Sequence, residues 1–249
     1  MSELVTRVDA EGIATLSFNR PDVLNALSPK LFETLRAHVD AIAEDTEAVG
    51  CVILRGEGRA FSAGNDLRAI TAGEQAPSPH FQAETLDAIE ALPQPVIAAV
   101  RGHCYTGALE VVLACDLLVA SDAARFVDSH GKWGMTPTWG MSQRLPRRVG
   151  LLKAKELMFR GRPVDGAEAV EIGLANVCVP DAELEARTTD LARQIVANSW
   201  CSLRGEKKLL NEGQRYTLAE GLAYERKHSA GATPDTTQRL KAFGKKKSG

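Results

Sequence analysis

One stretch of the chain, residues 96–120, constrains the fold more than any other: VIAAVRGHCYTGALEVVLACDLLVA. It opens with Val96–Val100, a short apolar run with the β-branched residues typical of a buried strand. Gly102 ends this run, an apolar segment with helical potential starts at Gly107, and an extended apolar segment returns at 117–120. The stretch therefore predicts a strand, a turn, a helix and a second strand in that order.

One charged residue, Glu110, lies inside the otherwise apolar predicted helix. A carboxylate in such a place is paired, exposed at the helix surface, or functional. Because the Cα–Cβ bonds of a helix tilt toward its N-terminus, Glu110 points back to the first turn, where the amide of Gly107 has no intrahelical partner. A free backbone donor beside a carboxylate suits a reaction that builds negative charge on a carbonyl oxygen while a base moves a proton.

Composition and net charge indicate the general class of protein. The chain has 249 residues, of which 44% are hydrophobic and 25% charged, and this fits one soluble globular domain with or without an appendage. The formal net charge of −2 argues against nucleic acid as the main partner. The two basic runs, at 144–148 and 245–247, are therefore interpreted as solvated surface.

Cysteine usage and the lack of targeting signals predict a cytoplasmic protein. Residues 1–10 are polar and of mixed charge, unlike a signal peptide, and no run of about 18 apolar residues predicts a membrane span. The five cysteines are odd in number and lie mostly in apolar segments, which is typical of reduced thiols. CxxC and HExxH spacings are absent, so we expect no metal site.

The first part of the chain carries clear local signals. They predict an antiparallel hairpin (4–8 and 13–18), a helix that begins at Ser28-Pro29 and ends near 44, a strand (51–54), a glycine-rich connection (56–67), a mobile polar loop (71–80) and a helix (81–91). The connection lacks the third glycine of a dinucleotide-binding GxGxxG loop, because Phe61 stands there. Strand, glycine loop and helix occur around 52–67 and again around 96–114, which predicts parallel strands joined by helical crossovers.

The second part predicts smaller elements followed by helices. We expect an extended segment (126–130), helices (150–160 and 165–172), a strand (175–179), a long helix capped by Asp181 and reaching about 198, and further helical segments (203–212 and 218–228). Residues 1–198 are predicted to form the α/β core, and 199–249 a helical region without strand signals. That region is expected to pack on the core or on another subunit.

Several motifs together resemble the crotonase (enoyl-CoA hydratase/isomerase) superfamily. They are NAL (25–27), AFSAGNDL (60–67), PVIAAVRGHCYTGALEVVLACD (95–116), GMTPTWGMSQRLPRRVG (134–150) and GRPVDGAEAVEIGLANVCVP (161–180). Their order and spacing cover most of the chain. The resemblance implies a crotonase-like spiral of ββα units, a C-terminal helical trimerisation region, and assembly as a homotrimer or a dimer of trimers. It also implies acyl-CoA substrates and no separate cofactor, because coenzyme A is part of the substrate.

The resemblance places the reacting groups on particular residues. The backbone amides of Asn65 and Gly107 are expected to form an oxyanion hole, since both follow glycine-containing turns at the start of helices. Glu110 matches the first catalytic glutamate of the hydratases; the alternative is a buried carboxylate paired with an arginine or the backbone. The second glutamate is replaced by His130, which Asp128 is expected to orient because residues i and i+2 of an extended segment share a face. The alternative for His130 is a pocket-lining or structural role.

Substrate contacts follow from the same resemblance. Contacts to coenzyme A are expected from residues in and directly after the NAL and AFSAGNDL segments and from the C-terminus: Ala26, Ala63, Asp66, Leu67, Arg68, Phe243 and Lys246. The acidic residue and glycine that usually precede the C-terminal contacts are absent, and 236–238 are Thr-Thr-Gln. Trp133 and Trp139 are candidates for the wall of the acyl pocket, with packing in the core as the alternative.

Three functions compete on this reading. The first is an enoyl-CoA hydratase that uses Glu110 and His130 as its acid–base pair. The second is an isomerase, decarboxylase or thioester hydrolase working through the same enolate, which the histidine at 130 motivates. The third is a non-catalytic acyl-CoA binding subunit. Neither nucleic acid nor a membrane is expected as a partner.

Overall fold

A six-stranded sheet with the order β1-β2-β3-β4-β6-β9 forms the centre of the molecule. The computed structural model describes residues 3–246. The first two strands form an antiparallel hairpin and all later pairs in this sheet are parallel, which confirms both the predicted hairpin and the helical crossovers. The strands are β1 (Val5–Ala10), β2 (Ile13–Phe18), β3 (Cys51–Gly56), β4 (Val96–Val100), β6 (Leu117–Ser121) and β9 (Val177–Val179).

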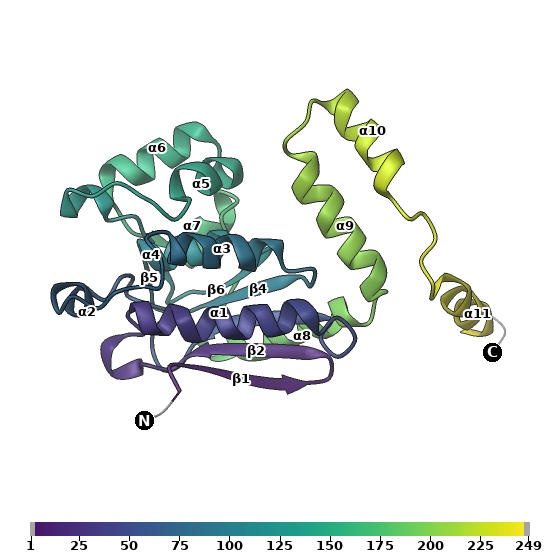
Figure 1. Ribbon diagram of the computed structural model, residues 1–249, viewed down its shortest axis with the longest axis horizontal. Helices are drawn as coiled ribbons and strands as arrows, with labels where there is room; N and C mark the ends of the chain where they lie inside the picture. Colours follow the sequence, from purple (N-terminus) through teal and green to yellow (C-terminus); the bar gives the residue numbers. More distant parts are fainter. Residues whose placement is uncertain (1–2, 247–249) are drawn as a thin grey trace.

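Helices cover both faces of this sheet (Figure 1). On one face α1 (Pro29–Glu44), α3 (Phe81–Ala91) and α4 (Gly107–Leu113) bury the larger apolar core, and on the other α8 (Leu184–Val196) buries a smaller one. Successive strand residues serve opposite faces: Val52 and Leu54 of β3 belong to the larger core, and Ile53 to the smaller. Because both faces of the central strands are buried, the sequences of these strands are almost continuously apolar.

A second, three-stranded sheet sets the position of the candidate site. It has the order β5-β7-β8, and its strands are β5 (His103–Tyr105), β7 (Arg125–Val127) and β8 (Val164–Asp165). The extended segment predicted over 126–130 is therefore wrong at its end, because a 3₁₀ helix begins at His130. The short strand β5 was not predicted; it directly precedes the turn into α4.

Further helices pack around the ends of the sheet. They are α2 (Leu67–Thr71), α5 (Met141–Val149), α6 (Leu151–Arg160) and α7 (Gly166–Glu171). The predicted cap at Asp181 is wrong, because a 3₁₀ turn over Asp181–Glu183 precedes α8 and no side chain caps that helix. The basic run at 144–148 is also not solvated surface throughout: Arg144 is half-buried in ion pairs, and Arg148 donates to the carbonyls of Leu113 and Cys115.

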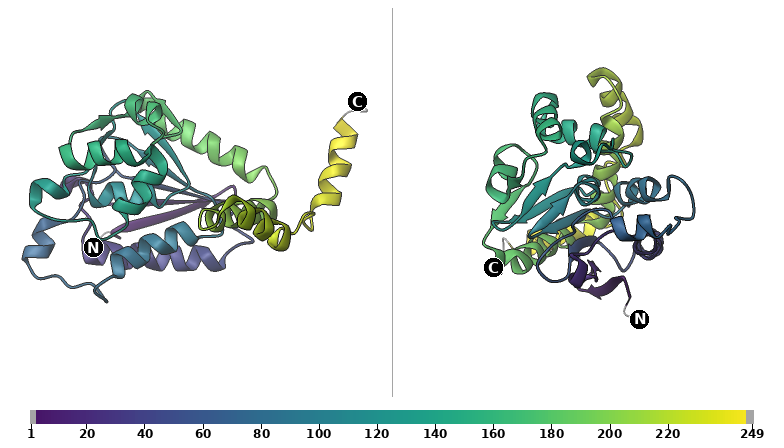
Figure 2. Two further views of the ribbon diagram at one scale, coloured as in Figure 1. Left: turned by 90° about the horizontal axis from the view of Figure 1, so that it is seen from above. Right: turned by 90° about the vertical axis from the view of Figure 1, so that its left-hand side faces the viewer.

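The C-terminal helices extend away from the body, as Figures 1 and 2 show. They are α9 (Trp200–Gly213), α10 (Leu218–His228) and α11 (Thr236–Lys246), the last of which was not predicted. One buried ion pair anchors α9: the Nζ atom of Lys207 lies 2.7 Å from Oδ2 of Asp116 and also donates to the carbonyl of Gln94. In contrast, α10 buries none of its side chains, and Leu218 is 81% exposed.

Three thiols lie in the interior without disulfide partners. Cys51, Cys104 and Cys115 are buried, whereas Cys178 and Cys201 are partly accessible. Burial raises the pKa of the Cys51 and Cys115 thiols to about 12 and raises that of Cys104 well above its usual value. Within residues 3–246, every helix is too short or too polar to cross a bilayer.

Candidate active site

Two turns bring the predicted oxyanion residues to neighbouring positions. The segment around Ser62 runs beside β5, with its amide donating to the carbonyl of His103 (2.8 Å) and its carbonyl accepting from Tyr105 (3.2 Å). Gly64 has a φ of +90°, and a Cβ atom there would lie 2.5 Å from the Tyr105 carbonyl oxygen and 3.7 Å from the nitrogen of Gly107. Only glycine allows this close approach of the two turns.

Both amides in question are unused by the protein. Over the described residues, neither Asn65 nor Gly107 donates its backbone N–H to another protein group, although the flanking amides of Asp66 and Thr106 do. Gly107 is the first residue of α4, so its amide is one of the donors that a helix leaves without an internal acceptor. The structure thus provides two neighbouring backbone donors that have no acceptor within the described residues.

Glu110 is buried in α4 and only one of its oxygens is fully engaged. Its exposed fraction is 2%, and Oε1 accepts hydrogen bonds from the amides of Trp139 and Met141, both at 3.0 Å. The other oxygen, Oε2, lies 3.7 Å from Nε2 of His130. Burial raises the pKa of Glu110, and the two amides and His130 offset that rise only in part. The expected alternative of backbone pairing therefore applies to Oε1 alone.

His130 and Asp128 form a tight pair beside Glu110. Nδ1 of His130 lies 2.6 Å from Oδ1 of Asp128, and the same oxygen accepts the backbone N–H of His130 at 3.0 Å. The contact arises from a turn after β7 rather than from the expected extended segment. Burial lowers the pKa of His130, but the hydrogen bond and charge of Asp128 and the charge of Glu110 outweigh it, so the pKa is raised overall. This arrangement leaves Nε2 facing Glu110.

Thr106, which the sequence did not single out, joins these two parts of the site. Its φ of +52° is rare for a β-branched residue and is sustained by bonds on both sides. Its amide donates to the carbonyl of Val127 at 2.7 Å, and its hydroxyl lies 2.5 Å from the hydroxyl of Ser129 and accepts the Ser129 amide at 3.2 Å. The turn that presents the Gly107 amide is therefore tied to the residue preceding His130.

Trp139 closes the site over the start of α4. A Cβ atom on Gly107 would lie 2.5 Å from the indole ring, so residue 107 has no room for a side chain. The ring also packs edge-on against Phe32, with a centroid distance of 5.0 Å. Trp139 thus contributes its amide to Glu110 and its ring to the surface around Gly107. The other tryptophan of this segment, Trp133, is largely exposed.

Four of the residues expected to contact coenzyme A line one cavity. Its volume is about 680 Å³, and its lining includes Asn65 and the expected residues Ala26, Asp66, Leu67 and Arg68. The lining also contains two arginines that the sequence analysis missed, Arg20 and Arg59. Cationic guanidinium groups suit phosphate oxygens, and in the sequence Arg20 was seen only as part of a turn.

The other expected contacts are placed differently. The Asp66 carboxylate caps α2 and lies 2.8 Å from Nη1 of Arg20, so it holds the cavity wall together. Ala63 is not part of the lining, and its amide donates to the carbonyl of Leu24. Phe243 lies on α11, which is on the opposite side of the molecule from α2 (Figure 1). The side chain of Lys246 lies outside the described part of the structure.

The assembled chemistry is that of an acid–base pair beside two free amides. Oε2 of Glu110 and Nε2 of His130 face each other at 3.7 Å, and Asp128 supports the charged form of the imidazole. In the part of the chain that the structure describes, no set of three or more His, Cys, Asp or Glu side chains is placed to hold a metal ion. The geometry therefore fits proton transfer coupled to stabilisation of an oxyanion.

Comparisons with known proteins show which family the chain belongs to. The family model for enoyl-CoA hydratase/isomerase matches residues 9–247. A Mycobacterium tuberculosis protein named "Probable enoyl-CoA hydratase echA8" is 37% identical over 98% of this chain and 95% of its own length. The crystal structure of an enoyl-CoA hydratase from Bacillus anthracis is 33% identical, with a TM-score of 0.92 over 98% of this chain and 97% of that one. A Thermobifida fusca YX chain solved in complex with acetoacetyl-CoA is 29% identical, with a TM-score of 0.83 over 90% and 92%. The chain belongs to the enoyl-CoA hydratase/isomerase family, the crotonase superfamily.

Proposed function

We propose that this protein is an enoyl-CoA hydratase, which adds water across the 2,3 double bond of an enoyl-CoA thioester. One observation carries the proposal: Oε2 of Glu110 and Nε2 of His130 lie 3.7 Å apart, next to two unused amides on neighbouring turns. Family membership supports the substrate class, since the Thermobifida fusca relative was solved with acetoacetyl-CoA bound.

The two amides supply the stabilisation of negative charge. The thioester oxygen accepts hydrogen bonds from Asn65 and Gly107, and these bonds strengthen as the carbonyl becomes an enolate. Loss of one such donor costs about 3–4 kcal/mol of transition-state stabilisation. Because the donors belong to the backbone of turns held by close packing, the hole is pre-formed before the substrate enters.

The carboxylate and the imidazolium supply the proton transfers. Glu110 accepts a proton from water through Oε2 while the water oxygen bonds to the β-carbon, and His130 delivers its Nε2 proton to the α-carbon of the enolate. Glu110 ends protonated and His130 neutral, so the pair has moved one proton from the histidine side to the glutamate side. Return of that proton from Oε2 of Glu110 to Nε2 of His130, which lies 3.7 Å away, restores the starting state.

Turnover of crotonyl-CoA tests the proposal directly. The expected result is loss of the enoyl thioester absorbance in the native protein, with 3-hydroxyacyl-CoA as the product. The variants Glu110→Gln and His130→Gln should lose this activity while keeping the fold. Native-like turnover in either variant would remove the assigned acid–base pair.

A second reaction uses the same pair and deserves a separate assay. Replacement of the usual second carboxylate by His130 gives a group that holds and returns a single proton, as isomerisation of a 3-enoyl-CoA requires. Product analysis with 2-enoyl, 3-enoyl and malonyl-type thioesters separates hydration from isomerisation, decarboxylation and hydrolysis. Acyl-CoA binding without deuterium exchange at the α-carbon would instead indicate a non-catalytic subunit.

Assembly and location form the last part of the proposal. The exposed apolar side chains on α9 to α11, which include Leu210, Leu218 and Leu240, support self-association as a homotrimer or a dimer of trimers. In such an assembly Phe243 and Lys246 are proposed to reach coenzyme A bound to a neighbouring copy. Light scattering on the purified protein tests the oligomeric state.

Free buried thiols support a reducing compartment such as the cytoplasm, which cell fractionation tests.

A further inference from the structure

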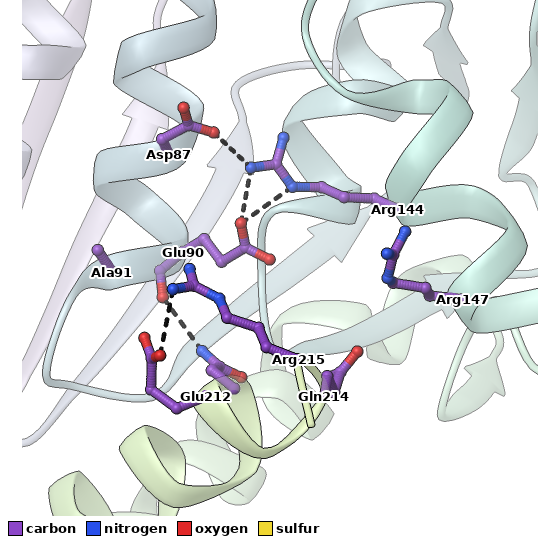
Figure 3. Close-up of a pocket in the computed structure, with 9 residues that line it drawn as sticks. Asp87, Glu90, Ala91, Arg144, Arg147, Glu212, Gln214 and Arg215 are labelled. Carbon is purple, nitrogen blue, oxygen red and sulfur yellow. Dashed lines mark hydrogen bonds and ion pairs between the residues drawn. The ribbon is translucent and has the colours of Figure 1, made fainter. Parts of the chain in front are cut away.

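Arg144 connects α3 to the loop that holds Glu110. From α5 its guanidinium reaches two carboxylates of α3, with Nη2 2.6 Å from Oδ1 of Asp87 and 2.6 Å from Oε2 of Glu90 (Figure 3). Nε makes a second contact with Glu90 at 3.1 Å. The remaining nitrogen, Nη1, donates to the backbone carbonyl of Trp139 at 2.8 Å. The side chain is 13% exposed, so these contacts are largely shielded from water.

The same residue, Trp139, is held at both ends of its backbone. Its carbonyl is bound by Arg144, and its amide donates to Oε1 of Glu110, where Met141 supplies the second donor. Gly140 stands between them with a φ of +111°, and a Cβ atom there would overlap the guanidinium of Arg144. The short loop is therefore shaped around the arginine.

We infer that Arg144 is a positioning residue for the reaction: through the Trp139 carbonyl it holds the two amides that fix Oε1 of Glu110 and so aims Oε2 at His130. The inference rests on the proposed function, because it concerns the carboxylate assigned there as the base. Arg144 itself touches neither Glu110 nor His130, so its effect passes through the loop.

An arginine is required for this arrangement because one planar group serves three acceptors. The guanidinium group binds Asp87, Glu90 and the Trp139 carbonyl at once. The single ammonium group of a lysine does not reproduce these three contacts. Behind it lies a cavity of about 570 Å³ whose lining includes Arg144, Asn211 and Arg215 (Figure 3). A truncated side chain leaves the loop carbonyl facing this space instead of a fixed donor.

The cavity also makes the inference testable by chemical rescue. The variant Arg144→Ala should lose up to about 100-fold in kcat with KM changed little, since a displacement near 1 Å of a reacting group has an effect of that size. Added guanidinium ion, entering through the cavity, should restore part of kcat, whereas sodium or methylammonium at equal ionic strength should not. A general structural defect would not respond to the shape of the added cation.

Arg147 provides the matched control. It lies one turn further along α5, is exposed, and donates to the carbonyl and side chain of Gln143 rather than to the loop. Arg147→Ala should retain native kcat and show no response to guanidinium. If Arg144→Ala does not fold, Arg144→Lys carries the test, with a reduced kcat expected; native kcat in a folded Arg144 variant overturns the inference.

A measurement without turnover separates this inference from the proposed function. The amides of Trp139 and Met141 lower the pKa of Glu110 against the effect of burial, so a loosened loop should raise that pKa further. Infrared titration of the Glu110 carboxyl, identified by its loss in Glu110→Gln, measures this directly. A raised Glu110 pKa in Arg144→Ala supports the positioning role even if the protein does not hydrate crotonyl-CoA. An unchanged Glu110 pKa refutes the positioning role even if the protein does hydrate crotonyl-CoA.

Discussion

Replacing Glu110 by glutamine should separate activity from stability. The amide of glutamine is close in shape to the carboxyl group, and its oxygen can still accept from the amides of Trp139 and Met141, which lie 3.0 Å from Oε1. Its NH₂ group then takes the place of Oε2 opposite His130. The variant loses the charge and the capacity to accept a proton, but keeps the packing.

The magnitudes favour a stable but inactive variant. Two charge-assisted hydrogen bonds become neutral ones, at a loss of about 1 kcal/mol each. Relief from burying a charge, which costs several kcal/mol per ion, opposes that loss. Because the folded pKa of Glu110 is raised, the native protein loses stability as pH rises from its unfolded value near 4.5 through the folded one, and glutamine has no such dependence. At pH 7 we therefore expect a Tm at or above that of the native protein.

The catalytic effect should be large. Removal of a general base lowers rates by about 10²–10⁴, or about 3–5 kcal/mol in the barrier. Hydration of crotonyl-CoA measures kcat, and thermal melts at pH 4 and pH 7 measure stability. Glu171→Gln, on the exposed end of α7, is the control and should change neither. Two results would contradict this expectation. One is native kcat in Glu110→Gln, and the other is a Tm lowered by several degrees at pH 7.

Three further substitutions test the rest of the site and its support. Asp128→Asn removes the charge and strong acceptor that raise the pKa of His130, so the alkaline limb of the kcat profile, where the imidazolium is lost, should move to lower pH. Ser129→Ala removes the hydroxyl partner of the strained threonine before α4 and should lower the unfolding free energy in urea by about 1 kcal/mol; an unchanged value contradicts that contribution. Lys207→Ala leaves the partly buried carboxylate of Asp116 without its cation and should cost about 3 kcal/mol in the same assay, with a loss below 1 kcal/mol as the contrary result.

The elements with strong local signals could be predicted from the sequence. Ser28 and Pro29 mark the start of α1, and the Ser28 hydroxyl indeed accepts the amide of Leu31 at 3.2 Å. The apolar strands β3, β4 and β6 were placed within two residues of their ends because they are buried on both faces. The C-terminal helix α10 was also placed at its observed bounds, and a capping box formed by Thr217 and Glu220 marks its start.

What escaped prediction depends on contacts between distant segments. The strand β5 is three residues long and exists through its pairing with β7, which no local pattern announces. The basic run at 144–148 suggested solvated surface because sequence spacing does not show that Arg144 faces the acids of α3. Thr106 at positive φ contradicts the usual preference for glycine there, and its contacts with Val127 and Ser129 explain it. In the candidate site, the motif residues could be predicted from the sequence. The residues that hold them in place, such as Thr106 and Arg144, could not.

The buried thiols can report local opening of the structure. With a pKa near 12, Cys51 and Cys115 are ionised to only about 10⁻⁴ at pH 8, so an alkylating reagent should modify them chiefly when the surrounding structure opens. Cys104 sits on β5, two residues before the strained turn, so its modification rate should report transient release of the strand that carries the Gly107 amide. Cys201, partly accessible on α9, should be modified first and supplies the reference rate within the same molecule.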